Sequence, residues 1–102
     1  MKPLISNRGR KIIKAGTLSK QTKTKNYLKR FVVLEPNSIS YYKSSSLKKL
    51  RKRILLTSIH GKVKRGKHTN VFVIETQDGK QYKLKGISRV ETKNWIRVLN
   101  KA

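Results

Sequence analysis

The sequence contains no cysteine and only four acidic residues among its 102. The lack of cysteine excludes disulfides, thiolate zinc sites and a cysteine nucleophile. The acids and histidines are Glu35, Glu75, Asp78, Glu91, His60 and His68. The acids form no evident carboxylate pair for general acid–base work, and the histidines lie in basic, loop-like sequence without carboxylate or thiolate company. We therefore expect no enzyme activity, no cofactor and no metal site.

The sequence also lacks a long hydrophobic run. No apolar stretch approaches the ~20 residues that a membrane-spanning helix needs. The first residues lack the apolar segment of a secretory signal, and the two ends lack lipid-attachment motifs. We therefore expect any membrane contact to be peripheral and made through the folded surface. The absence of cysteine also fits the reducing cytosol.

Positive charge is what the chain has in excess. It carries 27 Lys and Arg residues and a formal net charge of +23. The length fits one domain. Hydrophobic residues make up 35% of the chain, but they are clustered, as in Tyr27–Leu34 and Val71–Ile74. This clustering predicts one modest core instead of a disordered polycation. The charge predicts an anionic partner.

Short strand-like segments follow a basic, aperiodic extension at residues 1–11, so we expect one domain over residues 12–102. The segments are rich in β-branched and aromatic residues and are bounded by polar turns. The expected strands are Ile12–Lys20, Tyr27–Leu34, Ile39–Lys43, Ile54–Thr57, Ile59–Val63, Val71–Thr76 and Gln81–Lys85. Asp78–Gly79 between the last two predicts a type I′ hairpin, in which both central residues have positive φ.

The last segment has helical spacing. Ser88 and Glu91 are three apart, as in a capping box. Trp95 and Leu99 are four apart, which places them on one face of a helix. We predict an amphipathic helix from about Ser88 to Lys101, with Trp95 as a core anchor. Seven short antiparallel strands and one helix predict a mainly β fold, a barrel or sandwich capped at one end by the C-terminal helix.

Five segments in this order resemble the pleckstrin homology (PH) domain family. They are Gly16-Thr17-Leu18-Ser19-Lys20, Lys29-Arg30-Phe31-Val32-Val33-Leu34, Tyr41-Tyr42-Lys43, Phe72-Val73-Ile74-Glu75-Thr76 and Trp95. Together they cover about residues 12–101. The resemblance implies the PH fold and a binding module of a larger signalling protein.

Members of the family that bind phosphoinositides carry a Lys at the end of the first strand and a basic-x-basic pattern in the second. Lys20 and Arg30 match the first and last of these positions, whereas the middle one is Leu28. Tyr41 matches a tyrosine that hydrogen-bonds a headgroup phosphate in such domains. Lys52 lies close to a basic position of the fourth strand. The resemblance therefore implies a phosphoinositide site built around these residues.

Binding a headgroup takes several cations and donors that converge on one place. In the predicted topology the loops at 21–26 and 44–53 lie at the same open end, and the basic loop at 64–68 lies near them. The expected phosphoinositide-binding residues are Lys20, Lys23, Lys25, Arg30, Tyr41, Lys49, Arg51 and Lys52. The other cations would attract the domain to anionic lipids.

Residues 61–67 spell G-x-x-x-x-G-K, the core of a phosphate-binding loop. The next residue is His68 instead of Ser or Thr, and a strand follows where a helix is needed, so we interpret this segment as a basic loop between strands. A phosphoinositide-binding membrane module, at the cytoplasmic face of the plasma membrane or an endomembrane, is the favoured hypothesis. A PH-like module for protein–protein interaction is one alternative. The other is a basic RNA-binding or ribosome-associated protein, for which no RNP pattern or zinc-finger spacing is present.

Overall fold

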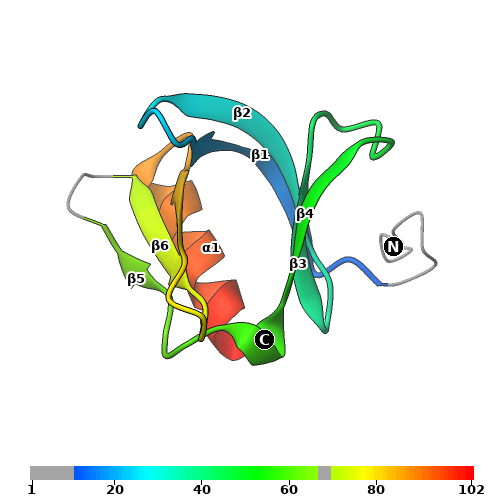
Figure 1. Ribbon diagram of the computed structural model, residues 1–102. Coiled ribbons are helices and arrows are strands. Elements are labelled where there is room, and N and C mark those ends of the chain that lie inside the picture. Colours follow the sequence, from blue (N-terminus) through cyan, green and yellow to red (C-terminus); the bar gives the residue numbers. More distant parts are fainter. Residues whose placement is uncertain (1–10, 67–69) are drawn as a thin grey trace.

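The computed structural model describes residues 11–66 and 70–102. The strands are β1 (Lys14–Gln21), β2 (Tyr27–Leu34), β3 (Ser38–Tyr42), β4 (Leu50–Leu55), β5 (Lys64–Arg65), β6 (Val71–Glu75) and β7 (Gln81–Lys85), and the helices are the 3₁₀ turn η1 (Leu56–Ser58) and α1 (Arg89–Lys101). The strands form one antiparallel sheet in the order β4-β3-β2-β1-β7-β6-β5 (Figure 1). The predicted mainly β fold with one C-terminal helix is confirmed.

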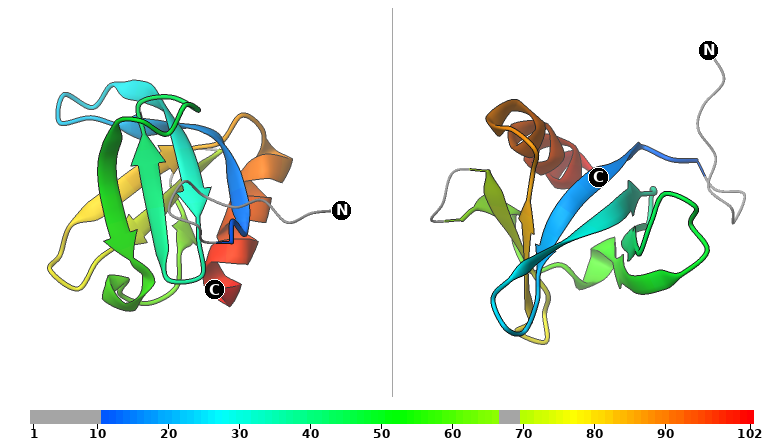
Figure 2. Two further views of the ribbon diagram at one scale, coloured as in Figure 1. Left: turned by 90° about the vertical axis from the view of Figure 1, so that its right-hand side faces the viewer. Right: turned by 90° about the horizontal axis from the view of Figure 1, so that it is seen from above.

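The sheet folds back on itself at the junction between β1 and β7. β1 pairs with β2 along its whole length, but it pairs with β7 only through Ser19↔Lys85 and Lys20↔Leu84. Figures 1 and 2 show the result: β1–β4 and β5–β7 form two facing parts, and α1 covers one opening between them. The interior of this open barrel holds the core.

The core follows the period-two alternation of the strands. Its buried members are Leu18, Val32, Leu34, Ile39, Ile54, Val63, Phe72, Ile74, Leu84, Trp95 and Leu99. Trp95 is 1% exposed, so its predicted place in the core is confirmed. Because Trp95 and Leu99 project from α1 into the barrel, burial of this face holds the helix against the sheet.

The predicted helix start is also confirmed. Ser88 has extended backbone angles, and its Oγ accepts a hydrogen bond from the backbone N–H of Glu91 at 3.1 Å. The Glu91 carboxylate reaches across to β1 and pairs with Lys14 Nζ at 2.6 Å. The Lys14 ammonium also lies 5.2 Å from the centroid of the Trp95 ring. The first turn of α1 is thereby tied to β1 as well as capped.

The predicted boundaries of the fourth strand were wrong. β4 begins at Leu50, inside the basic segment 44–53 that was expected to be a loop, and it ends at Leu55. β4 lies at one end of the sheet order, so it pairs with another strand of the described sheet along one edge only. Cations are common on edge strands, and there they hide the apolar alternation that marks a strand. Leu56–Ser58, expected to continue the strand in part, forms η1.

The fifth strand was also misplaced. The predicted strand Ile59–Val63 is reduced to a single bridge, Ile59↔Thr76. β5 lies at Lys64–Arg65, within the segment 64–68 that was expected to be a loop. Residues 1–10 of the expected N-terminal extension, and residues 67 and 68, lie outside the described residues.

The turn between β6 and β7 differs from the predicted type I′ hairpin. Gly79 has φ +87°, but Asp78 is not among the described residues with positive φ. The backbone N–H of Thr76 donates to the carbonyl of Lys80 at 2.9 Å, and that of Gly79 donates to the carbonyl of Thr76 at 2.9 Å. The loop is therefore one residue longer than expected, and only its last position needs the left-handed conformation that glycine adopts easily.

Candidate functional site

A hollow of about 310 Å³ opens where β1, β2 and β3 approach the loops at one end of the barrel. In Figure 1 these loops, β1–β2 and β3–β4, lie at the upper end. The hollow is lined by Lys20, Thr22, Lys23, Leu28, Arg30, Tyr41 and Arg51. Its lining includes four cations, a phenol and a threonine hydroxyl, and no carboxylate. This inventory fits an anionic ligand.

Strand pairing explains why the first of these side chains meet. Lys20 lies opposite Leu28, and Leu18 lies opposite Arg30. Leu18 is buried in the core, and residues two apart in a strand share a face. Lys20, Leu28 and Arg30 therefore continue the inner face of the sheet beyond the core to the mouth of the barrel.

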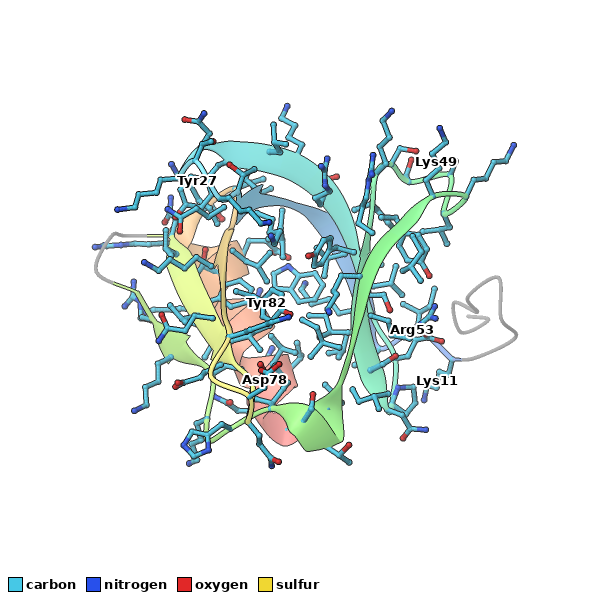
Figure 3. The ribbon with its side chains drawn as sticks, viewed as in Figure 1. Lys11, Tyr27, Lys49, Arg53, Asp78 and Tyr82 are labelled. Carbon is cyan, nitrogen blue, oxygen red and sulfur yellow. The ribbon has the colours of Figure 1, made fainter. Side chains whose placement is uncertain are left out.

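Two aromatic rings lie close to the Lys20 ammonium. Its Nζ is 5.4 Å from the centroid of the Tyr41 ring and 5.9 Å from that of Tyr82. Both distances are within the range of cation–π attraction. Figure 3 shows Tyr82 pointing from β7 into the space between the two parts of the sheet. Sequence reasoning missed Tyr82, although its spacing of two from the buried Leu84 places it on the inner face.

The ionisation of the site reflects this crowding. Burial lowers the pKa of Lys20, and the nearby positive charge of Arg30 lowers it further. Burial raises the pKa of Tyr41, Tyr82 raises it further, and Arg30 opposes the shift. The Tyr41 hydroxyl is therefore a neutral donor at neutral pH. An anion placed between Lys20 and Arg30 would relieve their mutual repulsion.

A β-bulge brings Arg51 to the hollow. Tyr41 pairs with Lys52 and Tyr42 pairs with Leu50, so Arg51 is an extra residue without a partner in β3. Bulges re-aim side chains in this way. Arg51 lines the hollow with Tyr41, whereas Tyr42 is buried elsewhere.

Three of the expected site residues do not line the hollow. Lys25 is exposed in the β1–β2 loop, where it has φ 67°. Lys49 is exposed just before β4, and in Figure 3 it lies at the upper end, away from the barrel interior. Lys52 lines a separate hollow of about 400 Å³ that it shares with Asp78. For Lys49 and Lys52 the difference comes from the bulge and from the true start of β4, which the sequence pattern does not show. Lys25 lies in the expected loop, but of the two loop lysines only Lys23 lines the hollow.

The described part of the basic segment 64–68 also lies elsewhere. Lys64 and Arg65 line a different hollow on the outer face of the sheet. The expectation that this segment lies near the open end is therefore wrong for its described residues. The physical reason is the pairing of β5 with β6, at the far edge of the sheet from β4.

Two further observations concern the described residues as a whole. They include no group of three or more His, Asp or Glu side chains arranged to hold a metal ion. They also include no helix that is long and apolar enough to cross a membrane.

Comparisons with known proteins identify related domains. The sequence profile of the PH domain matches residues 12–102. The crystal structure of the C-terminal PH domain of pleckstrin is similar, with TM-score 0.80 and 30% identity over 89% of this chain and 96% of that one. The same domain in complex with D-myo-Ins(1,2,3,5,6)P5 gives TM-score 0.79 and 29% identity, covering 89% and 94%. The Slm1 PH domain in complex with inositol 4-phosphate shares the fold, with TM-score 0.76 and 22% identity, covering 88% and 94%. A comparison with curated protein sequences found no match.

Proposed function

Because this chain belongs to the PH domain family, we propose that it is a peripheral membrane-targeting module that binds phosphoinositide headgroups in the hollow between β1, β2 and β3. The observation that carries the proposal is the convergence of Lys20, Arg30 and Tyr41 in that hollow. The complex of the C-terminal PH domain of pleckstrin with an inositol pentakisphosphate supports the choice of ligand.

Each of the three side chains has a distinct part in binding. The Arg30 guanidinium can hold two phosphate oxygens with its planar fork of N–H donors. The Lys20 ammonium supplies a point charge, and the Tyr41 hydroxyl donates a hydrogen bond without adding charge. Because two rings already restrict Lys20, less side-chain freedom is lost on binding.

The exposed cations around the mouth have a second part in binding. Lys25 and Lys49 are exposed in the two loops beside the hollow. Each cation near an anionic leaflet adds roughly 1 kcal/mol of attraction before screening. These loops would face the membrane, at the cytoplasmic side of the plasma membrane or of an endomembrane, and would hold the hollow against it. The parent protein would be a larger signalling protein.

Leu28 sets the selectivity of the hollow. It is 46% exposed at the mouth, directly opposite Lys20. It stands at the position where the family's phosphoinositide-binding pattern has a cation, so the pocket has one charge fewer than that pattern gives. We expect headgroup selectivity to be weaker, and the general attraction to anionic lipids to be a larger share of the binding.

Liposome co-sedimentation tests the proposal. Vesicles that contain a single phosphoinositide are compared with phosphatidylserine vesicles of equal surface charge, at ~150 mM salt so that exposed charges are screened. We expect tighter binding to at least one phosphoinositide than to phosphatidylserine. Equal binding to every vesicle at matched charge would eliminate the pocket and leave only electrostatic attraction.

A further inference from the structure

A hollow of about 570 Å³ is separate from the candidate site. We name it the β5 groove and define it by His60, Lys62, Lys64, Arg65, Val73 and Glu75. It lies between the outer surface of β6 and the segment that enters β5. Residues 61–66 of the G-x-x-x-x-G-K motif lie in that segment, in β5 and directly after it, and the proposed function leaves their cations unused.

The groove faces away from the barrel interior. In β6, Phe72 and Ile74 are fully buried in the core, so the alternate residues Val73 and Glu75 lie on the outer face. Lys64 pairs with Val73 in the sheet. In Figure 1 the chain leading into β5 runs along the lower end, opposite the β1–β2 and β3–β4 loops. A flat membrane at the upper end would leave the groove open.

The backbone of this wall is held at several points. The N–H of Val63 donates to Asn100 Oδ1 at 2.8 Å, and the carbonyl of Val63 accepts from Asn100 Nδ2 at 3.2 Å. The Val63 side chain is 5% exposed and belongs to the core. On either side, His60 N–H bonds to the Glu75 carbonyl at 2.7 Å and Gly66 N–H to the Val71 carbonyl at 2.8 Å. The cations between these points are therefore presented on a fixed backbone.

The charge of the groove indicates an anion. Lys62, Lys64 and Arg65 are all exposed, and Glu75 is the one carboxylate among the described residues that line it. Cations fixed next to each other repel, and an anionic partner would relieve that repulsion. A backbone held in this way also loses less conformational entropy on binding than a flexible loop would.

We propose that the β5 groove binds an extended acidic segment of a partner protein. A membrane fits poorly, because the groove is concave and lies at the end opposite the candidate headgroup site. Single-stranded RNA fits less well, because His60 is the one ring among the described residues that line the groove, whereas RNA-binding grooves stack successive bases on several rings. An extended acidic peptide can place alternate carboxylates on Lys62 and Lys64, which share a face on either side of the buried Val63, and lay an apolar side chain on Val73, with Arg65 at the edge of the same hollow.

The test uses the full chain and a labelled peptide of alternating Glu and Val, about twelve residues long, followed by fluorescence anisotropy at ~150 mM salt. The groove variant is Lys62→Gln, Lys64→Gln, Arg65→Gln. The control variant is Lys93→Gln, Arg97→Gln, Lys101→Gln, which removes the same charge from exposed positions of α1. We expect the groove variant to bind the peptide at least about tenfold more weakly, and the control to stay within about threefold of the wild type.

A second readout separates this proposal from the headgroup site. The groove variant should retain binding of inositol pentakisphosphate, and Arg30→Gln should retain binding of the peptide. Amide NMR shifts on peptide addition should fall on residues 60–66 and 73–75. Groove-dependent peptide binding supports the inference even if no headgroup binds. No peptide binding by the wild type, equal loss in the two triple variants, shifts confined to the β1–β2 loop, or tighter groove-dependent binding of an RNA of equal charge would each overturn it.

Discussion

Arg30 and Lys29 are adjacent in β2 and lie on opposite faces. They therefore form a matched pair for separating binding in the hollow from general electrostatic attraction to an anionic surface. Arg30 lines the hollow beside Lys20. Lys29 is exposed and pairs with Ser19 on the outer face. Arg30→Gln and Lys29→Gln each remove one positive charge at nearly the same place in the chain. The two variants therefore change the net charge equally and the hollow very differently.

The expected difference follows from the two environments. A hydrogen bond to a charged group contributes about 1.5–3 kcal/mol, and each 1.4 kcal/mol is about tenfold in affinity. Loss of the Arg30 guanidinium should weaken binding of a soluble inositol pentakisphosphate by about 10- to 100-fold. Lys29 makes no contact with the hollow, and a cation near an anionic surface is worth roughly 1 kcal/mol before screening. Its loss should cost at most about fivefold, and less at physiological salt.

Isothermal titration calorimetry with the soluble ligand measures the affinity of the hollow alone. Co-sedimentation with phosphoinositide liposomes measures the affinity of the hollow together with the general attraction to anionic lipids. Thermal unfolding of both variants verifies that they are folded. In calorimetry, Arg30→Gln should lose much more affinity than Lys29→Gln. In co-sedimentation, the two losses of affinity should be closer to each other. Similar losses of affinity for Arg30→Gln and Lys29→Gln in calorimetry would refute the reasoning, because net charge alone would then account for the binding.

Three further predictions concern single side chains. Leu28→Lys adds a cation to the wall of the hollow at a half-exposed position, so it should tighten headgroup binding about five- to tenfold; unchanged affinity in calorimetry would contradict the role given to Leu28. Burial and Arg30 lower the pKa of Lys20 from 10.5, so the folded chain releases this proton at a lower pH than the unfolded chain. The resulting destabilisation is complete below the lowered pKa and disappears as pH rises toward 10.5. The wild type should therefore gain stability relative to Lys20→Met over this alkaline window in calorimetric melts, and a relative loss would contradict the sign. Asn100→Ala removes both hydrogen bonds to Val63 and should lower the free energy of unfolding in urea by about 1–2 kcal/mol. A change under about 0.5 kcal/mol would show that these two hydrogen bonds do not stabilise the fold.

Local patterns were enough to predict much of the fold. The alternation of β2 and the spacing of Ser88, Glu91 and Trp95 depend on neighbours in the chain, and the structure has them as expected. The same alternation explains why Lys20 and Arg30, which come from paired strands, lie in one hollow. Residues that belong to a regular ladder can be placed from sequence because their faces follow from counting.

The other parts of the fold and of the site depend on a bulge, on long-range pairing and on strand boundaries, which the alternation of residues along the sequence does not show. Lys49, Arg51 and Lys52 were all expected at the site, but the bulge in β4 brings Arg51 alone of the three to the hollow, because one extra residue reverses the faces that follow it. The proximity of Tyr82 to Lys20 depends on the pairing of β1 with β7, which joins segments some sixty residues apart through two residue pairs. The boundary between a basic loop and a basic edge strand has no clear sequence pattern.

Lys20 belongs both to the short junction between β1 and β7, which closes the barrel, and to the candidate site. Lys20 is one of the two β1 residues paired with β7, and its ammonium lines the hollow. A ligand that binds only the closed barrel stabilises closure by mass action, by about 2.7 kcal/mol at a hundred times its Kd. The β1–β7 junction, which has two residue pairs, would then be stabilised by a bound headgroup through Lys20.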